Sequence, residues 1–215
     1  TMTKKILITG ANGQLGHEMR NALKGNSRFE CIFTDVAELD ICNAEAVKQT
    51  IADNHIDYIV NCAAYTQVDK AEDNTELCKK INTDAVENLA RAAADYGARM
   101  MHISTDYVFN GRGYRPYTED MVPDPQSVYG STKLEGEKIL TDICPESIII
   151  RTAWLYSPYG NNFVKTMLHL GEEREELSVV ADQIGTPTCA ADLAQAILVI
   201  LQADTFVPGT YHFSD

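Results

Sequence analysis

Hydrophobic residues along the chain alternate between short continuous runs and longer segments with helical spacing. The continuous runs are rich in Ile, Val and Met and predict buried strands, because a strand covered on both faces needs apolar residues throughout. Segments with an apolar residue every three or four positions predict helices with one buried face. The predicted strands are 5–9, 29–34, 57–61, 100–104, 148–151, 178–181 and 211–213. Four predicted helices cover about 44–53, 75–96, 162–170 and 191–201. Two more are predicted to end near Leu23 and near Leu140.

This alternation of strands and helices predicts an α/β fold. We expect a doubly wound parallel sheet, the Rossmann fold, with helices on both faces. A loop rich in Gly and Pro at 110–126 interrupts the pattern. Ser214 and Asp215 follow the last predicted strand without a helix stop signal or a polar tail, so we expect a chain that is incomplete at its C-terminus.

Gly10, Gly13 and Gly16 lie between the first predicted strand and the first predicted helix. In this setting the first glycine allows a tight turn, the second lets a pyrophosphate approach the backbone, and the third allows close packing of helix on strand. The helix N-terminus then faces the phosphates. The loop predicts dinucleotide binding, and the alternative is a purely structural turn. The residues predicted to bind the cofactor here are Gly10, Asn12, Gly13, Gln14, Leu15 and Gly16.

Further cofactor contacts are predicted near the ends of the second and third strands. Asp35 lies about 20 residues after the loop, where a carboxylate can accept hydrogen bonds from the adenosine ribose and repel a 2′-phosphate. Neither Lys nor Arg follows at 36–38, so we expect NADH to bind at least as well as NADPH. A strand-end turn and plain packing of small residues are the alternatives. The residues predicted to contact the cofactor here are Asp35, Asp40, Ile41, Ala63, Ala64 and Tyr65.

Tyr129 and Lys133 share one face of a predicted helix, and Thr105 follows the fourth strand, where a parallel sheet presents its ligand groups. Hydride transfer to a carbonyl carbon leaves charge on an oxygen that must be protonated, and Tyr129 is the predicted general acid. The Lys133 ammonium is expected to lower the tyrosine pKa from its ordinary value of about 10 and to hydrogen-bond the nicotinamide ribose. Tyr129 and Lys133 are therefore also predicted cofactor contacts. The alternative is an exposed Tyr and Lys on a solvated helix.

These motifs occur in the order found in a known family. The chain resembles the extended, nucleotide-sugar-modifying branch of the short-chain dehydrogenases/reductases and, within it, the dTDP-4-dehydrorhamnose reductases. The resemblance extends from Lys4 to Asp215, and its later motifs are more specific than the glycine loop. The segments that carry it are 10–16, 60–66, 68–72, 104–109, 129–133, 151–156 and 182–188.

The resemblance implies an enzyme that uses NADPH or NADH to reduce the C4 keto group of dTDP-4-dehydro-L-rhamnose, giving dTDP-L-rhamnose for cell-surface polysaccharide. It implies Thr105, Tyr129 and Lys133 as catalytic residues, and Thr105, Asp106 and Trp154 at the dTDP-linked sugar. For Asp106 and Trp154 the alternatives are a strand-end cap and core packing. The resemblance is also compatible with a homodimer.

Some members of the family hold Mg²⁺ between glutamates at a dimer contact. Glu18 can match one of these glutamates, but Ala191 stands where another would lie. No metal site is therefore predicted, and a dependence on Mg²⁺ is in doubt.

Two alternative functions stay open. One is a reductase or epimerase of another nucleotide-linked keto sugar, and the other is a non-catalytic, cofactor-binding regulatory subunit. The presence of Thr105, Tyr129 and Lys133 favours catalysis. Residues 1–155 are predicted to form an NAD(P)-binding Rossmann domain. Residues 156–215 are predicted to supply the remaining Rossmann elements, interleaved with the start of a small, incomplete substrate-binding part.

Composition narrows the classes of partner. Hydrophobic residues make up 45% and charged residues 23% of the chain, which is typical of a globular protein. The 18 Lys and Arg against 31 Asp and Glu give a net charge of −13, which disfavours nucleic acid and anionic membranes as partners. No apolar run approaches the ~18 residues of a membrane span. The 6 cysteines lack metal-ligand spacing and are expected to be reduced thiols of a cytoplasmic protein.

Overall fold

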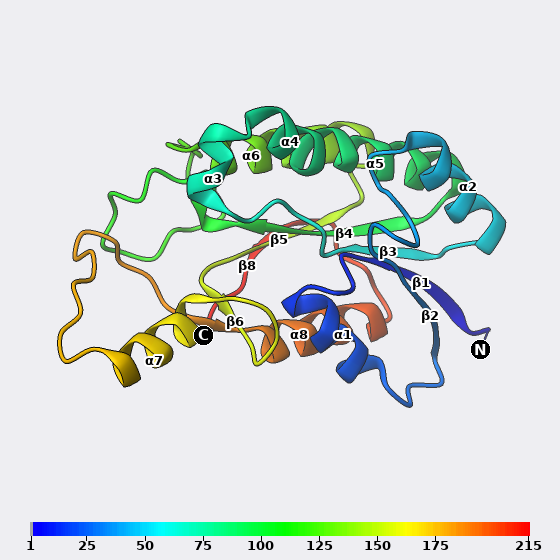
Figure 1. Cartoon of the computed structure of the whole chain (residues 1–215). Helices are drawn as coiled ribbons and strands as arrows, with labels where there is room; N and C mark the ends of the chain where they lie inside the picture. The colour runs from blue at the N-terminus through cyan, green and yellow to red at the C-terminus, as the bar shows by residue number, and fades with distance from the viewer. Residues whose placement is uncertain (1) are drawn as a thin grey trace.

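The computed structural model describes residues 2–215 and contains a parallel sheet of six strands between two layers of helices (Figure 1). The strand order is β2-β1-β3-β4-β5-β8, and every neighbouring pair is parallel. The prediction of a doubly wound α/β fold is confirmed. The strands are β1 (Lys4–Thr9), β2 (Phe29–Phe33), β3 (Tyr58–Asn61), β4 (Arg99–Thr105), β5 (Ile148–Thr152) and β8 (Gly209–His212).

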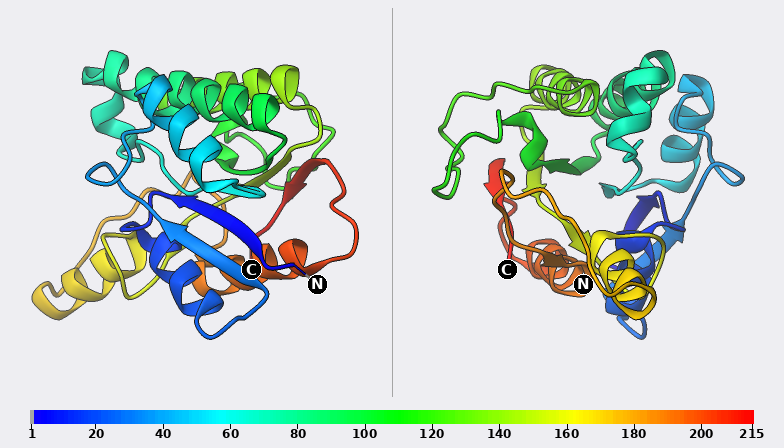
Figure 2. Two further views of the ribbon diagram at one scale, coloured as in Figure 1. Left: turned by 90° about the vertical axis from the view of Figure 1, so that its right-hand side faces the viewer. Right: turned by 60° about the vertical axis from the view of Figure 1, so that its left-hand side comes forward.

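Helices cover both faces of this sheet, as Figure 2 shows from two further directions. One layer contains α1 (Gln14–Leu23) and α8 (Ala190–Gln202), and the other contains α2 (Ala44–Asn54), α5 (Ala85–Tyr96) and α6 (Val128–Ile143). Alternate residues of each strand enter opposite cores: Ile6 and Ile8 pack toward α1 and α8, whereas Leu7 packs toward α2 and α5. Burial on both sides explains the continuous apolar runs. None of the helices within residues 2–215 is long and apolar enough to cross a membrane.

The chain reverses its direction of travel across the sheet at β1. It passes from β1 to β2 on one side and then returns to β3 on the other side of β1. In open parallel sheets, loops that leave such a point in opposite directions form a crevice at the carboxyl ends of the strands. The predicted site residues after β1, β3 and β4 all belong to this edge of the sheet.

Part of the chain after β5 lies outside the main sheet. β6 (Leu155–Tyr156) and β7 (Thr188–Cys189) pair in parallel as a small second sheet, and α7 (Phe163–Glu173) extends away from the main body (Figure 1). The chain then returns through α8 to β8, which pairs with β5. The predicted boundary at residue 155 between two parts of the protein stays a prediction.

Three details differ from the sequence prediction. The predicted strand 178–181 is wrong: this segment is exposed and unpaired within residues 2–215, and the small sheet uses Thr188–Cys189 instead. An apolar run forms a strand only where another strand lies beside it to complete a ladder, and here β6 pairs with β7 instead. The predicted helix 75–96 is continuous, but it contains α4 (Thr75–Lys79), a π-helical turn (Lys80–Asp84) and α5. A short helix that the pattern did not predict, α3 (Val68–Asp73), precedes it.

The depth of α6 above the sheet depends on Gly136. A Cβ atom at this position would overlap the backbone oxygen of Asn82 in the π-helical turn. We expect Gly136→Ala to lower the free energy of unfolding by about 1–3 kcal/mol, because overpacking a tight contact forces backbone shifts. The measurement is urea unfolding of the variant beside the parent protein.

Gly171 of α7 is the matched control. Among residues 2–215, no heavy atom beyond its own helix and neighbours lies within 4 Å of a Cβ placed there. Gly171→Ala should be neutral or stabilise by up to about 1 kcal/mol, because alanine favours helix and restricts the unfolded chain. Equal effects of the two substitutions would contradict the packing argument.

Candidate active site

The glycine loop is tightly packed at two of its glycines and is open at the third. Gly10 has φ +62°, and a Cβ there would come within 2.6 Å of the backbone of Ala63. A Cβ on Gly16 would come within 2.5 Å of Ala11. A Cβ on Gly13 would meet only the Gly10 carbonyl oxygen, at 3.4 Å. Gly13 is the N-cap of α1 and has no side chain to cover the first backbone N–H groups. This exposed helix N-terminus fits an anionic group such as a pyrophosphate.

Asp35 is fixed beside the glycine loop. Its carboxylate accepts hydrogen bonds from the backbone N–H of Asn12 at 3.0 Å and of Val36 at 2.8 Å. The Asp35 N–H donates to the Glu38 carboxylate at 2.9 Å. Two carboxylates therefore lie at the end of β2, where the protein would contact an adenosine ribose. This arrangement fits ribose hydroxyl groups better than a 2′-phosphate.

Two predicted cofactor residues cannot present their side chains to a ligand, and two others use theirs in hydrogen bonds within the protein. Leu15 is buried in the core under α1, and Ile41 is buried in the core under α2. The Asp40 carboxylate accepts a hydrogen bond from the Cys42 N–H at 3.0 Å and so shapes its own turn. Gln14 accepts hydrogen bonds from Ser157 at 3.2 Å and Asn162 at 3.0 Å. Any contact of Gln14 or Leu15 with a cofactor therefore involves the backbone.

Tyr129, Lys133 and Thr105 converge at the carboxyl end of β4, and all three are buried. Ser127 caps α6 by accepting a hydrogen bond from the Gly130 N–H at 3.0 Å, so Tyr129 lies in the first turn of the helix. The Thr105 side chain acts on the Tyr129 hydroxyl group and favours its ionised form. Lys133 donates from Nζ to the Ile103 carbonyl oxygen at 2.7 Å. The structure therefore brings these predicted residues together.

The electrostatics of Tyr129 differ from the sequence expectation. Burial raises the pKa of Tyr129 well above its ordinary value, and the Thr105 side chain opposes this rise only in part. Burial also lowers the pKa of Lys133 to about 8. The phenol is thus held in its protonated form in this structure, and the expected lowering of its pKa by Lys133 is wrong here.

Asp106 and Trp154 flank this cluster. Burial raises the pKa of the Asp106 carboxyl group, which accepts a hydrogen bond from Thr105 Oγ1 at 3.2 Å. Trp154 follows β5 in a left-handed backbone conformation, with φ +48°, that is strained for a side chain of this size. Its ring packs against Phe163, at 5.8 Å between ring centroids. A Cβ on Gly185 would lie 3.0 Å from the indole, so a larger residue at this position would press on the Trp154 ring.

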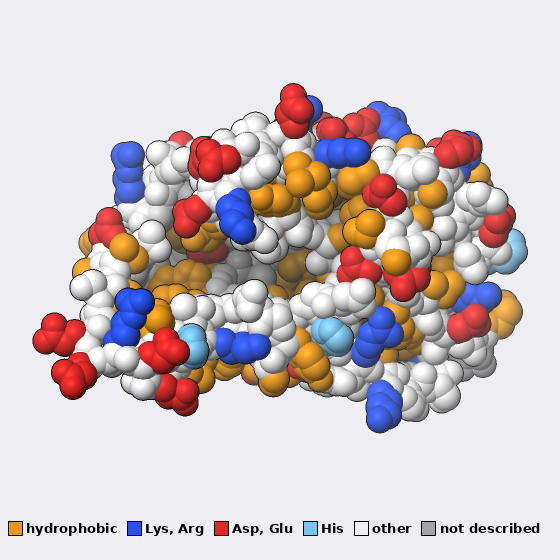
Figure 3. Space-filling model, in the orientation of Figure 1, with side chains coloured by type: hydrophobic (Ala, Val, Ile, Leu, Met, Phe, Trp, Pro, Cys, Tyr) orange, Lys and Arg blue, Asp and Glu red, His pale blue; other side chains and the backbone are white. Residues whose placement is uncertain are grey.

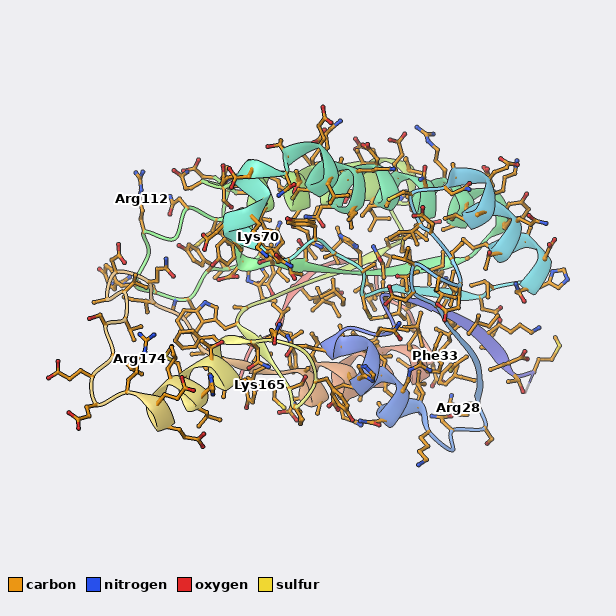
Figure 4. All side chains as sticks on the ribbon, viewed as in Figure 1. Arg28, Phe33, Lys70, Arg112, Lys165 and Arg174 are labelled. Carbon is orange, nitrogen blue, oxygen red and sulfur yellow. The ribbon has the colours of Figure 1, made fainter. Side chains whose placement is uncertain are left out.

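The face that carries these residues is hollowed. Figure 3 shows a depression between the edge formed by α3 and the edge formed by α1 and β6, with hydrophobic side chains inside it. Figure 4 places Lys70 of α3 on the upper side and Lys165 of α7 on the lower side of this depression. Basic groups therefore border the depression in a protein of net charge −13. In the part of the chain that the structure describes, no group of three or more His, Cys, Asp and Glu residues could hold a metal ion.

Comparison with known proteins identifies the family. Residues 4–215 match the family described as the RmlD substrate binding domain. The chain is 44% identical over 214 residues to a dTDP-4-dehydrorhamnose reductase of Aggregatibacter actinomycetemcomitans, covering 98% of this chain and 73% of the relative. It is 46% identical over 215 residues to the enzyme of that name from Escherichia coli (strain K12), covering 96% and 71%. The chain belongs to the dTDP-4-dehydrorhamnose reductase family. The resemblance drawn from the sequence motifs is confirmed.

Solved structures of this family have the same fold. The crystal structure of a dTDP-4-dehydrorhamnose reductase from Clostridium acetobutylicum superposes with a TM-score of 0.93 at 50% identity, covering 98% of this chain and 74% of that one. The enzyme from Bacillus anthracis, solved in complex with NADP, superposes with a TM-score of 0.94 at 44% identity, covering 100% and 75%.

Asn82 supports the candidate site, and the sequence analysis did not single it out. It lies in the π-helical turn, and such turns occur frequently at functional sites. Its side chain accepts from the Tyr65 N–H at 2.8 Å and donates to the Tyr65 carbonyl oxygen at 3.1 Å. Asn82 therefore fixes the loop after β3, in which Ala63 and Ala64 were predicted to contact the cofactor. An Asn within an otherwise apolar helix face was the only signal in the sequence.

We expect Asn82→Ala to release Tyr65 from both hydrogen bonds. The loss of two buried partners should lower the free energy of unfolding by about 1–3 kcal/mol. Exchange of the Tyr65 amide hydrogen should become faster by about tenfold or more, as local opening becomes easier. Hydrogen exchange followed by NMR checks this. The exposed Asn74 is the control: Asn74→Ala should change stability by less than about 0.5 kcal/mol. An unchanged Tyr65 exchange rate in Asn82→Ala would contradict the assigned role.

Proposed function

We propose that the protein is a reductase that uses a reduced nicotinamide dinucleotide to convert the C4 keto group of dTDP-4-dehydro-L-rhamnose to the hydroxyl group of dTDP-L-rhamnose. The observation that carries this proposal is the convergence of Tyr129, Lys133 and Thr105 at the end of β4, beside the open glycine loop at the end of β1. Family membership supports the same substrate class.

The residues around the glycine loop fit a dinucleotide. The N-terminus of α1 at Gly13 suits the pyrophosphate, and Asp35 suits the adenosine ribose. Lys133 suits the nicotinamide ribose as a hydrogen-bond donor. When bound, the dinucleotide supplies the hydride. The relative from Bacillus anthracis binds NADP, so NADPH, which carries a 2′-phosphate, and NADH, which lacks it, are both candidates here.

Tyr129 provides the proton that the reduction requires. Hydride addition at C4 leaves a pair of electrons on the carbonyl oxygen, and this oxygen takes the proton of the Tyr129 hydroxyl group. Burial keeps Tyr129 protonated before the reaction, because it raises the tyrosine pKa. Thr105 favours the phenolate that remains, once its hydroxyl proton turns from Asp106 to Tyr129. A proton from solvent then restores the phenol.

Asp106 and Trp154 are proposed to orient the sugar nucleotide. Asp106 is one residue from Thr105, and its oxygens can accept hydrogen bonds from sugar hydroxyl groups. The Trp154 indole offers an apolar face for a ring of the ligand. The basic groups Lys70 and Lys165 at the border of the depression can attract a dianionic substrate. A homodimer and a cytoplasmic location stay predictions.

The direct test is oxidation of NADH or NADPH by the protein. Oxidation should begin when dTDP-4-dehydro-L-rhamnose is added and not when a GDP-linked keto sugar is added. Oxidation with both sugars would favour a reductase of broader specificity. Cofactor binding without oxidation on any keto sugar would favour a regulatory subunit.

Tyr129→Phe removes the proposed proton donor and keeps the ring. We expect turnover to fall by about two to four orders of magnitude, the usual range for a lost general acid. Cofactor affinity should stay within a few-fold, since the hydroxyl group serves the substrate. Tyr96→Phe at the exposed end of α5 is the control and should leave turnover unchanged. Comparable turnover in Tyr129→Phe and the parent would exclude Tyr129 as the acid.

Asp35 is expected to set the cofactor preference. The protein should bind NADH at least as well as NADPH, because Asp35 and Glu38 place negative charge where a 2′-phosphate would lie. Asp35→Ala should weaken NADH by about tenfold or more, the effect of a lost charge-assisted hydrogen bond. Fluorescence titration measures both cofactors, with the exposed Asp95→Ala as control. A preference for NADPH that Asp35→Ala leaves unchanged would show that Asp35 does not read the ribose.

A further inference from the structure

Glu137 lies on the same face of α6 as Tyr129 and Lys133, one helical turn after Lys133. It is 4% exposed. Ser104 Oγ donates to its Oε2 at 2.7 Å, and the Arg151 guanidinium donates to both carboxylate oxygens at 2.7 to 3.2 Å. Ser104 on β4 and Arg151 on β5 are neighbours in the sheet register. The buried carboxylate of Glu137 thus accepts hydrogen bonds from side chains of both β4 and β5.

Three side chains of α6 contact three consecutive residues of β4. Lys133 donates to the Ile103 carbonyl, Glu137 accepts from Ser104, and Tyr129 lies beside Thr105, which lowers the tyrosine pKa. Ser104 lies between the two residues that hold Lys133 and Tyr129. A change at Glu137 therefore acts on the strand segment that positions both proposed catalytic groups.

The charge of Glu137 also acts on Lys133. Lys133 is 1% exposed, and burial lowers its pKa to about 8. The negative charge of Glu137 is the largest effect that opposes this lowering, ahead of the thiols Cys62 after β3 and Cys78 on α4.

The remaining ionisable groups around this pair come from the strands. His102 on β4 has a pKa far below its ordinary value and stays neutral. Arg151 on β5 pairs with Glu137, and its Nη1 lies 3.3 Å from Nε2 of His212 on β8. Because an arginine can only donate, this His212 nitrogen is the acceptor.

We propose that Glu137 is a positioning residue: its carboxylate keeps Lys133 in the ammonium form and holds Ser104 so that the segment 103–105 stays aligned with Tyr129 and Lys133. The proposal rests on the proposed reductase function, in which Lys133 donates hydrogen bonds to the cofactor ribose. The alternative is an ion pair that contributes to stability alone. The two differ in what happens to the titration of Lys133.

The first test replaces both charges together, in Glu137→Gln with Arg151→Met, so that neither charge is left buried without its partner. The side chain of Lys133 is followed by carbon NMR in the ligand-free protein, with Lys133→Met for assignment. The titration midpoint should fall by about one pH unit, because Glu137 lies one helical turn from Lys133 and raises its pKa, so its loss outweighs the loss of the Arg151 charge on β5. The loss of kcat/KM at alkaline pH should move to lower pH by the same amount. A midpoint equal to that of the parent would overturn the proposal.

Glu137→Asp is the conservative variant. It keeps the charge and shortens the side chain, whereas Gln keeps the length and removes the charge. The Lys133 midpoint in Glu137→Asp should stay within about half a pH unit of the parent value. If Glu137 served packing alone, the Lys133 midpoint would change less with Gln at position 137 than with Asp. That result would count against the proposal.

A measurement on the unmodified protein does not depend on the folding of any variant. If Glu137 and Lys133 interact, the carboxyl carbon of Glu137 must shift at the midpoint of Lys133 titration. The absence of that shift would overturn the proposal. Failure of the parent protein to reduce any keto sugar would count against the proposed function, while these titrations would still decide the relation of Glu137 to Lys133.

Discussion

The contact of α6 with β4 determines the arrangement of the rest of the site. Lys133 donates to the Ile103 carbonyl from a position that is only 1% exposed. A buried ammonium group is costly unless it has such a partner, so the helix must lie at one distance and in one register over the strand. Gly136 permits that distance by letting α6 pack directly on the π-helical turn. Tyr129 then reaches Thr105 without further adjustment.

Burial in this layer favours particular protonation states. It keeps Tyr129 neutral, which suits its proposed role as proton donor, and it destabilises the charge of Lys133. The pair of Glu137 with Arg151 brings two further charges into the same layer, where each satisfies the other. Arg151 also packs over the ring of Phe109, 5.2 Å from the ring centroid, which connects the layer to the loop after β4.

The glycine loop is coupled to the segment after β5. Gln14, the first residue of α1, hydrogen-bonds the backbone of Leu155 at 3.4 Å and the side chains of Ser157 and Asn162. His17 of the same helix stacks on Tyr159, with 4.5 Å between ring centroids. Asn162 also caps α7 by accepting from the Lys165 N–H at 2.9 Å. The helix that is proposed to face a pyrophosphate thus also supports the segment that carries Lys165.

The sequence by itself determined the alternation of strands and helices, the glycine loop and the pairing of Tyr129 with Lys133, because each depends on residues close together in the chain. The period of the hydrophobic residues shows which face of a helix or strand is buried. A spacing of four residues places Tyr129 and Lys133 on the same face of a helix. The same local reasoning failed at 178–181, since an apolar run becomes a strand only beside a free edge. It also included Leu15 and Ile41 among the cofactor residues, although packing turns their side chains into the cores.

Tertiary structure decided which distant residues meet. Asn82 reaches Tyr65, and Glu137 reaches Ser104 and Arg151, only because the sheet order and the depth of α6 bring these elements together. The protonation of Tyr129 was decided in the same way. The spacing of Tyr129 and Lys133 suggested a lowered pKa, but the pKa depends on how much water surrounds the phenol, and burial is a property of the whole fold.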